Sequence, residues 1–297
     1  MVVTDYFNPE FSDQAQLKIG DVITHINGKF VENIIDSLKI YYPSSNEASM
    51  LRDISADLLR SSKNTINLKY ISENQEKEQD VELHDREQLN MYYWYKINKD
   101  EKCYKLLDGN IGYVTLATIK EEDIPEIKKT FQNTQGIIID IRNYPSSFVP
   151  FALGSYFVTK STPFVKFTQG NPNNPGEFAF TKALSISPNG KTYKGKLVVL
   201  VNEKSQSQAE YTAMAFRAAK NSIIIGSTTA GADGNVSEIL LPGGLRTMIS
   251  GIGIYYPDGT KTQRIGIVPD ITVKPTVKGI KEGKDEVLEK AIEIINR

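Results

Sequence analysis

The chain has 297 residues, a net charge of −1, 40% hydrophobic and 24% charged residues, one cysteine and two histidines. The near-zero net charge gives no reason to expect a nucleic-acid partner, and a single cysteine excludes an intramolecular disulfide framework. No apolar run reaches the about 18 residues that would span a bilayer. Both histidines, His25 and His84, lie in the first third, so a Ser-His-Asp triad or a His-ligated zinc site confined to the last two thirds is excluded.

The first part of the chain, to about Leu83, predicts a small β-rich unit with one helix. Apolar and polar residues alternate around Asn27-Gly28, a typical hairpin turn. Further along, Met50, Ile54 and neighbouring apolar residues share one helical face. The predicted elements are a hairpin over 20–31, a helix over 46–62, a strand over 65–71, a charged hairpin tip over 72–80 and a return strand over 81–84.

Residues 86–103 predict a connector rich in aromatic side chains. It carries Tyr92, Tyr93, Trp94 and Tyr95 among polar residues. A stacking platform for nucleic acid would need an accompanying basic patch, which the sequence lacks. We therefore expect these aromatics to pack on the face of a domain.

From about residue 104 onward the pattern is that of an α/β domain. GIIIDIRN (136–143) and KLVVLVN (196–202) are near-continuous apolar runs of the kind found in buried parallel strands. Strand-helix-strand order repeats, which favours a parallel sheet with crossover helices. The predicted strands are 110–118, 136–143, 196–202 and 222–228; the helices are 121–133, 148–158, the segment after Ser207 and 286–295; a polar loop is predicted over 169–177.

Two serines, Ser205 and Ser207, lie where the strand 196–202 gives way to the next helix. Ser207 and Glu210 fit a capping box, in which each side chain satisfies a free backbone N–H group. A hydroxyl at a helix N-terminus is also well placed to act as a nucleophile, because the helix dipole and free amides favour developing negative charge. This position is the carboxyl end of a strand, where α/β sheets place their sites. Both interpretations stay open on these residues alone.

Five segments in order carry a resemblance that covers nearly the whole chain. They are VVTDYFNPEFSDQAQLKIGDVITHINGK (2–29), NIGYVTL (110–116), GIIIDIRN (136–143), VNEKSQSQAE (201–210) and YYPDGTKTQRIGIVPDITV (255–273). Together they resemble the C-terminal processing, or tail-specific, serine peptidases. The resemblance implies an α/β, crotonase-like (ClpP/crotonase-type) peptidase core over 104–297. It also implies a PDZ-like β-rich module over 1–85, whose front is missing, so that we expect the natural protein to extend upstream of Met1.

The resemblance also implies a site and a setting. Ser207 aligns with the family nucleophile, and backbone N–H groups near Ser146, Ser147 and Gln208 align with the oxyanion hole. The implied ligand is a polypeptide substrate or peptide, with no metal or organic cofactor, and the implied location is the periplasm or the cell surface. The oligomeric state is left open.

The catalytic base of the family does not carry over. The family lysine, 25 residues after the nucleophile, aligns with Ala232, and its supporting glutamine aligns with Val236. The sequence therefore looks closer to the tricorn-core-like branch, but Thr115 and Gln263 stand where that branch has a histidine and a glutamate.

Two functions remain open at this stage. One is a serine-type peptidase in which another Lys, Glu, Asp or Tyr supplies the base, with Lys204 and Lys120 as candidate amines. The alternative is a non-catalytic polypeptide-binding relative that has lost its base. They differ in whether a titratable side chain can reach the Ser207 hydroxyl.

Overall fold

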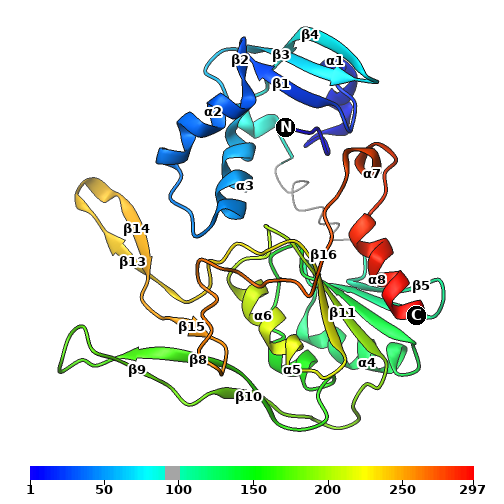
Figure 1. The fold of residues 1–297 in the computed structure, drawn as a ribbon, viewed down its shortest axis with the longest axis vertical. Helices are drawn as coiled ribbons and strands as arrows, with labels where there is room; N and C mark the ends of the chain where they lie inside the picture. Colours follow the sequence, from blue (N-terminus) through cyan, green and yellow to red (C-terminus); the bar gives the residue numbers. More distant parts are fainter. Residues whose placement is uncertain (91–100) are drawn as a thin grey trace. The chain divides into compact units, whose positions relative to one another are not determined.

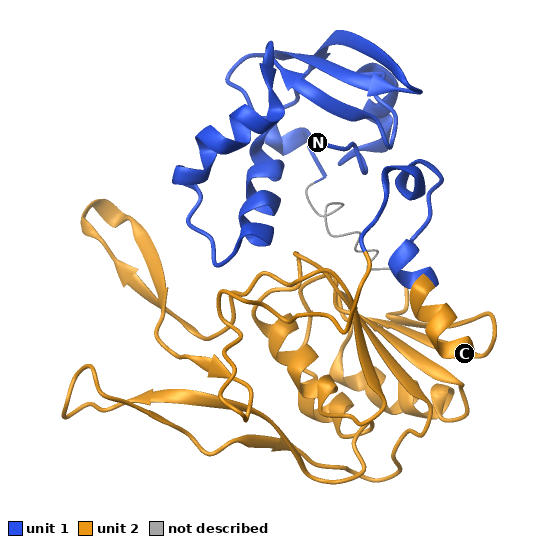
Figure 2. Ribbon diagram, viewed as in Figure 1, with its two compact units in different colours: residues 1–99, 274–289 blue, residues 100–273, 290–297 orange. Residues whose placement is uncertain are grey.

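The computed structural model describes residues 1–90 and 101–297, so the aromatic cluster predicted in the connector lies outside the described residues. The chain forms two compact units (Figure 2): unit 1 comprises residues 1–99 and 274–289, and unit 2 comprises residues 100–273 and 290–297. Residues 274–289 thus group with the first unit, although the sequence assigned them to the core.

Unit 2 is built around a six-stranded sheet with the order β16-β12-β11-β7-β6-β5 (Figure 1). All neighbouring strands are parallel except β5 and β6, which are antiparallel. The parallel sheet predicted from strand-helix-strand order is therefore present. The strands are β5 Tyr104–Leu107, β6 Ile111–Thr115, β7 Gly136–Asp140, β11 Lys196–Val201, β12 Ser222–Gly226 and β16 Ile271–Thr272.

Three crossover helices, α4 Ile124–Phe131, α5 Pro150–Gly154 and α6 Gln208–Arg217, pack with one face of this sheet in a single apolar cluster. All of β7 and nearly all of β11 are buried, which explains their continuous apolar sequences. The predicted helix over 148–158 is confirmed only in part, because α5 begins at a proline and ends at a glycine.

A second set of strands in unit 2 was not predicted. β8 Thr162–Gly170 pairs with β9 Phe178–Phe180, β10 Leu184–Ile186 and β15 Ile254–Tyr255, and a separate hairpin joins β13 Val236–Leu240 to β14 Arg246–Ser250. The loop predicted over 169–177 is wrong at its start, since Gln169 and Gly170 pair with β9. The hairpin residues are exposed on both faces, so no alternation of apolar and polar residues marked them.

Unit 1 contains a four-stranded antiparallel sheet of order β2-β1-β3-β4. The predicted turn at Asn27-Gly28 is confirmed, with φ of 48° and 75° at the two residues. The unit also has a helix that the sequence did not predict, α2, before the predicted α3. The bounds are β1 Val22–Ile26, β2 Lys29–Phe30, α2 Val31–Leu38, α3 Glu47–Asp57, β3 Thr65–Ser72 and β4 Gln75–Glu82.

The predicted return strand of the second hairpin in unit 1 is present, but it starts earlier than predicted: β4 begins at Gln75 and ends at Glu82. The tip is only Glu73-Asn74, both with positive φ, and the charged stretch behind it forms β4. β4 lies at the edge of the sheet and is largely exposed. Charged residues are tolerated there, because one side of an edge strand is open to solvent.

The remaining helices are short or lie near the C-terminus. They are α1 Ser12–Ala15, α7 Val277–Lys281 and α8 Glu286–Asn296, the last confirming the predicted C-terminal helix. Among the described residues, no helix combines the length and the apolar character needed to cross a membrane.

Candidate active site

Ser207 lies in a strained turn between β11 and α6. β11 ends at Val201, α6 begins at Gln208, and Ser207 is the N-cap residue with φ 55° and ψ −115°. This conformation is sparsely populated by residues that carry a Cβ atom, and it costs about 1–3 kcal/mol. Such strain persists only where the surrounding contacts enforce it, and it occurs often at functional sites.

Of the two serines at this junction, Ser205 has a structural role. It is completely buried, its hydroxyl donates to the carbonyl of Ile141 at 2.7 Å, and its hydroxyl oxygen accepts from the Asn202 amide at 3.1 Å. Its carbonyl accepts from the Ala230 amide at 3.0 Å. Ser205 therefore ties the turn to two neighbouring segments, whereas Ser207 lines a pocket.

Glu210 holds the Ser207 turn against the loop that follows β12. One carboxylate oxygen, Oε2, accepts from the amides of Ser207 at 3.1 Å and Ala232 at 3.0 Å. The other, Oε1, accepts from the hydroxyl of Thr229 at 2.5 Å and the amide of Gly231 at 2.7 Å. Burial raises the pKa of Glu210, while these four donors oppose the rise. The predicted capping partner thus fixes a second segment as well.

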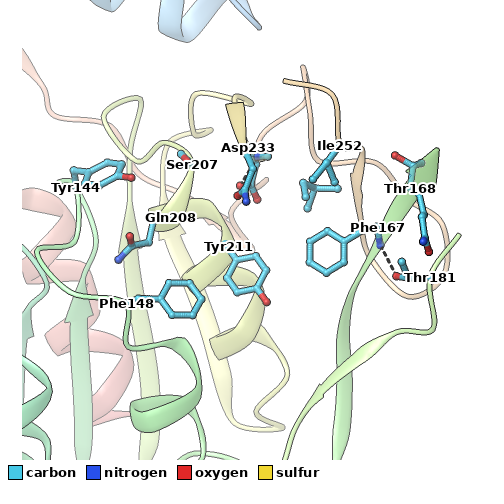
Figure 3. Close-up of a pocket in the computed structure, with 14 residues that line it drawn as sticks. Tyr144, Phe148, Phe167, Thr168, Thr181, Ser207, Gln208, Tyr211, Asp233 and Ile252 are labelled. Atoms are coloured by element: carbon cyan, nitrogen blue, oxygen red, sulfur yellow. Dashed lines mark hydrogen bonds between the residues drawn. The ribbon is translucent and has the colours of Figure 1, made fainter. Parts of the chain in front are cut away.

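A pocket of about 570 Å³ opens beside Ser207 (Figure 3). Its wall combines polar residues, among them Gln208 of α6 and Asp233, with a group of aromatic side chains. The Tyr211 ring lies 5.7 Å from that of Phe148 and 6.3 Å from that of Phe167 between ring centroids. The aromatic residues that line the pocket are Tyr144, Phe148, Phe167 and Tyr211. The pocket therefore suits a large apolar side chain.

Backbone amides near Ser207 differ in their availability to a substrate oxyanion. The amide of Gln208 is the first of α6, so it has no partner within the helix. The amide of Ser147 has no hydrogen-bond partner among residues 1–90 and 101–297. That of Ser146 already donates to the carbonyl of Leu116 at 2.9 Å. The Gln208 side chain donates to the carbonyl of Ser147 at 2.7 Å and so holds the two segments together.

Asp233 is the acidic residue of the pocket, and the sequence analysis did not single it out. Its side chain is only 6% exposed; Oδ1 accepts from the Gly234 amide at 2.8 Å, and Oδ2 is buried without a partner among the described residues. Burial raises the pKa of Asp233 from 3.8 to about 7, with the charge of Glu210 adding to the rise. The sequence held one signal for Asp233: this residue directly follows Ala232, the position that aligns with the family lysine.

The other residues weighed as bases do not line this pocket. The Lys120 amine lies 3.5 Å from the carboxylate of Glu122 and is 69% exposed, and Lys204 is likewise outside the pocket lining. Thr115 accepts from the Asn143 side chain at 3.3 Å. Gln263 donates to the carbonyls of Asp233 at 2.7 Å and Ile252 at 2.8 Å, and so supports the loop that bears Asp233.

No metal centre is formed by the part of the chain that is described: no group of three or more His, Cys, Asp or Glu side chains is placed to hold an ion. Cys103 is 4% exposed, and its thiol donates to the Asp123 carboxylate at 3.4 Å. Burial raises the pKa of Cys103 to about 12. This thiol is thus protonated at neutral pH and is no competing nucleophile.

A serine held in a strained strand-to-helix turn beside a binding pocket is an arrangement typical of serine hydrolases. Residues 110–273 match peptidase family S41, and because this segment is more than half of the chain, the protein belongs to that family. This confirms the family predicted from the sequence.

Relatives of known name agree with the family. The chain is 25% identical over 192 residues to a "Carboxy-terminal-processing protease" of Bartonella bacilliformis, covering 61% of this chain and 43% of that protein. It is 23% identical over 286 residues to a "Putative Tricorn-like protease C-terminal subunit" of Sulfurisphaera tokodaii, covering 94% and 29%. The chain thus spans less than half the length of either relative.

Among solved structures, the fold is similar to that of mature CPAF complexed with lactacystin. The TM-score is 0.73, with 15% sequence identity, and the match covers 95% of this chain and 79% of that one. At this level of identity the likeness concerns the fold.

Proposed function

We propose that this protein is a serine-type peptidase whose nucleophile is Ser207. The observation that carries the proposal is the backbone of Ser207, which is held at φ 55° and ψ −115° at a strand-to-helix turn beside a pocket of about 570 Å³. A helix cap alone needs no such strain, since N-cap residues ordinarily adopt extended backbone conformations. Membership of peptidase family S41 supports the same function. The alternative, a peptide-binding relative without catalysis, is not favoured.

In the proposed reaction, Ser207 attacks a peptide carbonyl whose oxygen lies among backbone donors. The amides of Gln208 and Ser147 are the available donors, and the Gln208 side chain fixes their separation by binding the carbonyl of Ser147 at 2.7 Å. Ser146 would first have to release its bond to Leu116. Such preorganised donors contribute most where negative charge develops in the transition state.

The proposed substrate is an extended polypeptide with a large apolar side chain next to the scissile bond. The aromatic side chains around Tyr211 support this, because their rings offer apolar area next to Ser207. An unfolded chain can place such a side chain in the pocket, whereas a folded protein keeps its apolar side chains buried.

The finer architecture is also proposed. The parallel sheet with its crossover helices supports a crotonase-like core within residues 104–297, and the antiparallel sheet with α2 and α3 supports a PDZ-like module within residues 1–85. We further propose that the protein acts in the periplasm or at the cell surface, as the family resemblance implies. Fractionation of cells that express the native gene tests this location, because recovery of the protein only with cytosolic markers would contradict it.

Labelling with a fluorophosphonate, followed by hydrolysis of an unfolded protein such as reduced casein, tests the function. We expect the unaltered protein to be labelled and active, and Ser207→Ala to lose both properties. Ser237→Ala, at an exposed position of β13 outside the pocket, is the matched control and is expected to keep both. Equal labelling of the unaltered protein and Ser207→Ala would remove Ser207 from the mechanism.

A further inference from the structure

The proposed nucleophile needs a base, because a serine hydroxyl holds its proton at neutral pH. Residues 101–297 contain no histidine. Among the described residues that line the pocket with Ser207, none is a lysine and Asp233 is the sole carboxylic acid. Burial raises the pKa of Tyr211 to about 12, so this phenol keeps its proton and is a poor acceptor. Among the described residues that line the pocket, Asp233 is therefore the carboxylic acid that could take a proton.

The Asp233 carboxyl group is oriented by its own loop. The Gly234 amide donates to Oδ1 at 2.8 Å, and this bond fixes one oxygen. Oδ2 is buried and has no hydrogen-bond partner among the described residues. Buried polar atoms are nearly always paired, so the unpaired oxygen of a residue that lines the pocket calls for an explanation, and a role as a proton acceptor in the site supplies one.

The backbone just before Asp233 is tied to the Ser207 turn through Glu210, and the Asp233 carbonyl is held by a second residue. The amide of Ala232, the residue before Asp233, donates to the same Glu210 oxygen as the amide of Ser207, at 3.0 and 3.1 Å respectively. The carbonyl of Asp233 itself accepts from the Gln263 side chain at 2.7 Å. The loop therefore cannot move away from Ser207 without breaking bonds to a buried carboxylate. In Figure 3, Asp233 lies between Ser207 and Ile252 at the pocket wall.

We propose that Asp233 is the general base of this site, in place of the absent lysine and histidine. This inference rests on the proposed peptidase function. As the Ser207 oxygen bonds to the substrate carbonyl carbon, its proton moves to Oδ2 of Asp233 and the carbonyl π pair moves onto the carbonyl oxygen. When the oxyanion collapses, the carbon–nitrogen bond breaks and Asp233 returns the proton to the leaving amine. Water then attacks the acyl-enzyme, giving its proton to Asp233, which passes it to Ser207 as the serine is released.

The ionisation of Asp233 agrees with this role. A general base works best when its pKa lies near the working pH, and burial brings that of Asp233 to about 7. The titratable groups that face it are Glu210 and Tyr211, both on α6, and Tyr144 shares the pocket. Glu210 is a positioning residue, because its carboxylate is engaged by four protein donors.

The test compares Asp233→Asn with Asp258→Asn, an exposed aspartate of a turn outside the pocket. Two rates are measured from pH 5 to 9: fluorophosphonate labelling of Ser207 and hydrolysis of reduced casein. For the unaltered protein and Asp258→Asn, we expect both rates to rise with a midpoint near pH 7. Asp233→Asn is expected to lose about 100-fold or more in both, and to lose the pH dependence, since it lacks the group that takes the proton.

Chemical rescue separates a base from a structural residue. Asp233→Ala leaves space for a small carboxylate, so added formate is expected to restore part of its labelling rate and to leave that of Asp233→Asn unchanged. If Asp233→Asn keeps rates within about threefold of the unaltered protein while Ser207→Ala is inactive, the base is another group and the proposed function stands. If the unaltered protein is neither labelled nor active, both the inference and the proposed function fail.

Discussion

Replacing Asp233 by asparagine is expected to stabilise the protein at alkaline pH while it abolishes the proposed activity. Asp233 is 6% exposed, and one of its carboxyl oxygens has no partner among the described residues. Its ionised form is therefore poorly solvated in the folded state. Asparagine has nearly the same shape, can keep the bond from the Gly234 amide and carries no charge.

The magnitude follows from the pKa, which burial raises from 3.8 to about 7. A folded-state pKa above the unfolded value means that the associated stability is complete below about pH 4 and is lost as the pH rises through about 7. The rise of the pKa from 3.8 to about 7 corresponds to a loss of about 4 kcal/mol in the free energy of unfolding. We thus expect Asp233→Asn to match the unaltered protein near pH 4 and to exceed its free energy of unfolding by about 2–4 kcal/mol at pH 8, the lower bound allowing for relaxation of the site.

Urea unfolding followed by circular dichroism at pH 4.5, 6, 7 and 8 measures this difference. Contributions from titratable groups that do not interact with Asp233 largely cancel when the two proteins are compared at each pH. Asp258→Asn is the control: it removes an exposed carboxyl whose pKa is lowered by the Thr260 amide, so it should show no gain as the pH rises. A difference between Asp233→Asn and the unaltered protein that stays constant with pH would refute the argument that burial raises this pKa.

Two further substitutions test the site and its support, and one reactivity measurement tests the burial of Cys103. The free energy of unfolding of Ser207→Gly should be about 1–2 kcal/mol higher than that of Ser207→Ala, because glycine relieves the strain at φ 55°. If Ser207→Ala is instead the more stable variant, the turn is unstrained. Glu210→Gln should lower the free energy of urea unfolding by about 3 kcal/mol, since an amide faces donors that a carboxylate accepted; a loss below about 0.5 kcal/mol would mean that these bonds contribute little. Cys103 should react with a thiolate-specific disulfide reagent at pH 8 only after unfolding, because burial raises its pKa to about 12; rapid reaction of the folded protein would contradict its burial.

The sequence determined the framework of the core. The apolar runs at 136–140 and 196–201 could only be buried strands, and both lie at the centre of the parallel sheet. The order of motifs gave the family, which the match over residues 110–273 confirms. The capping box formed by Ser207 and Glu210 could also be predicted from the sequence, because it depends on a local spacing of three residues.

Other features of the structure depend on contacts between segments that are distant in the sequence, and local sequence patterns do not predict them. The hairpin β13–β14 has no buried face, so no periodicity of apolar residues indicated it. The strained backbone of Ser207 is enforced by its long-range surroundings, where Glu210 binds the amide of Ala232. The environment of Asp233 depends likewise on burial under segments far away in the chain. A sequence shows which residues can ionise, but their solvation and partners, and hence their pKa, exist only in the folded chain.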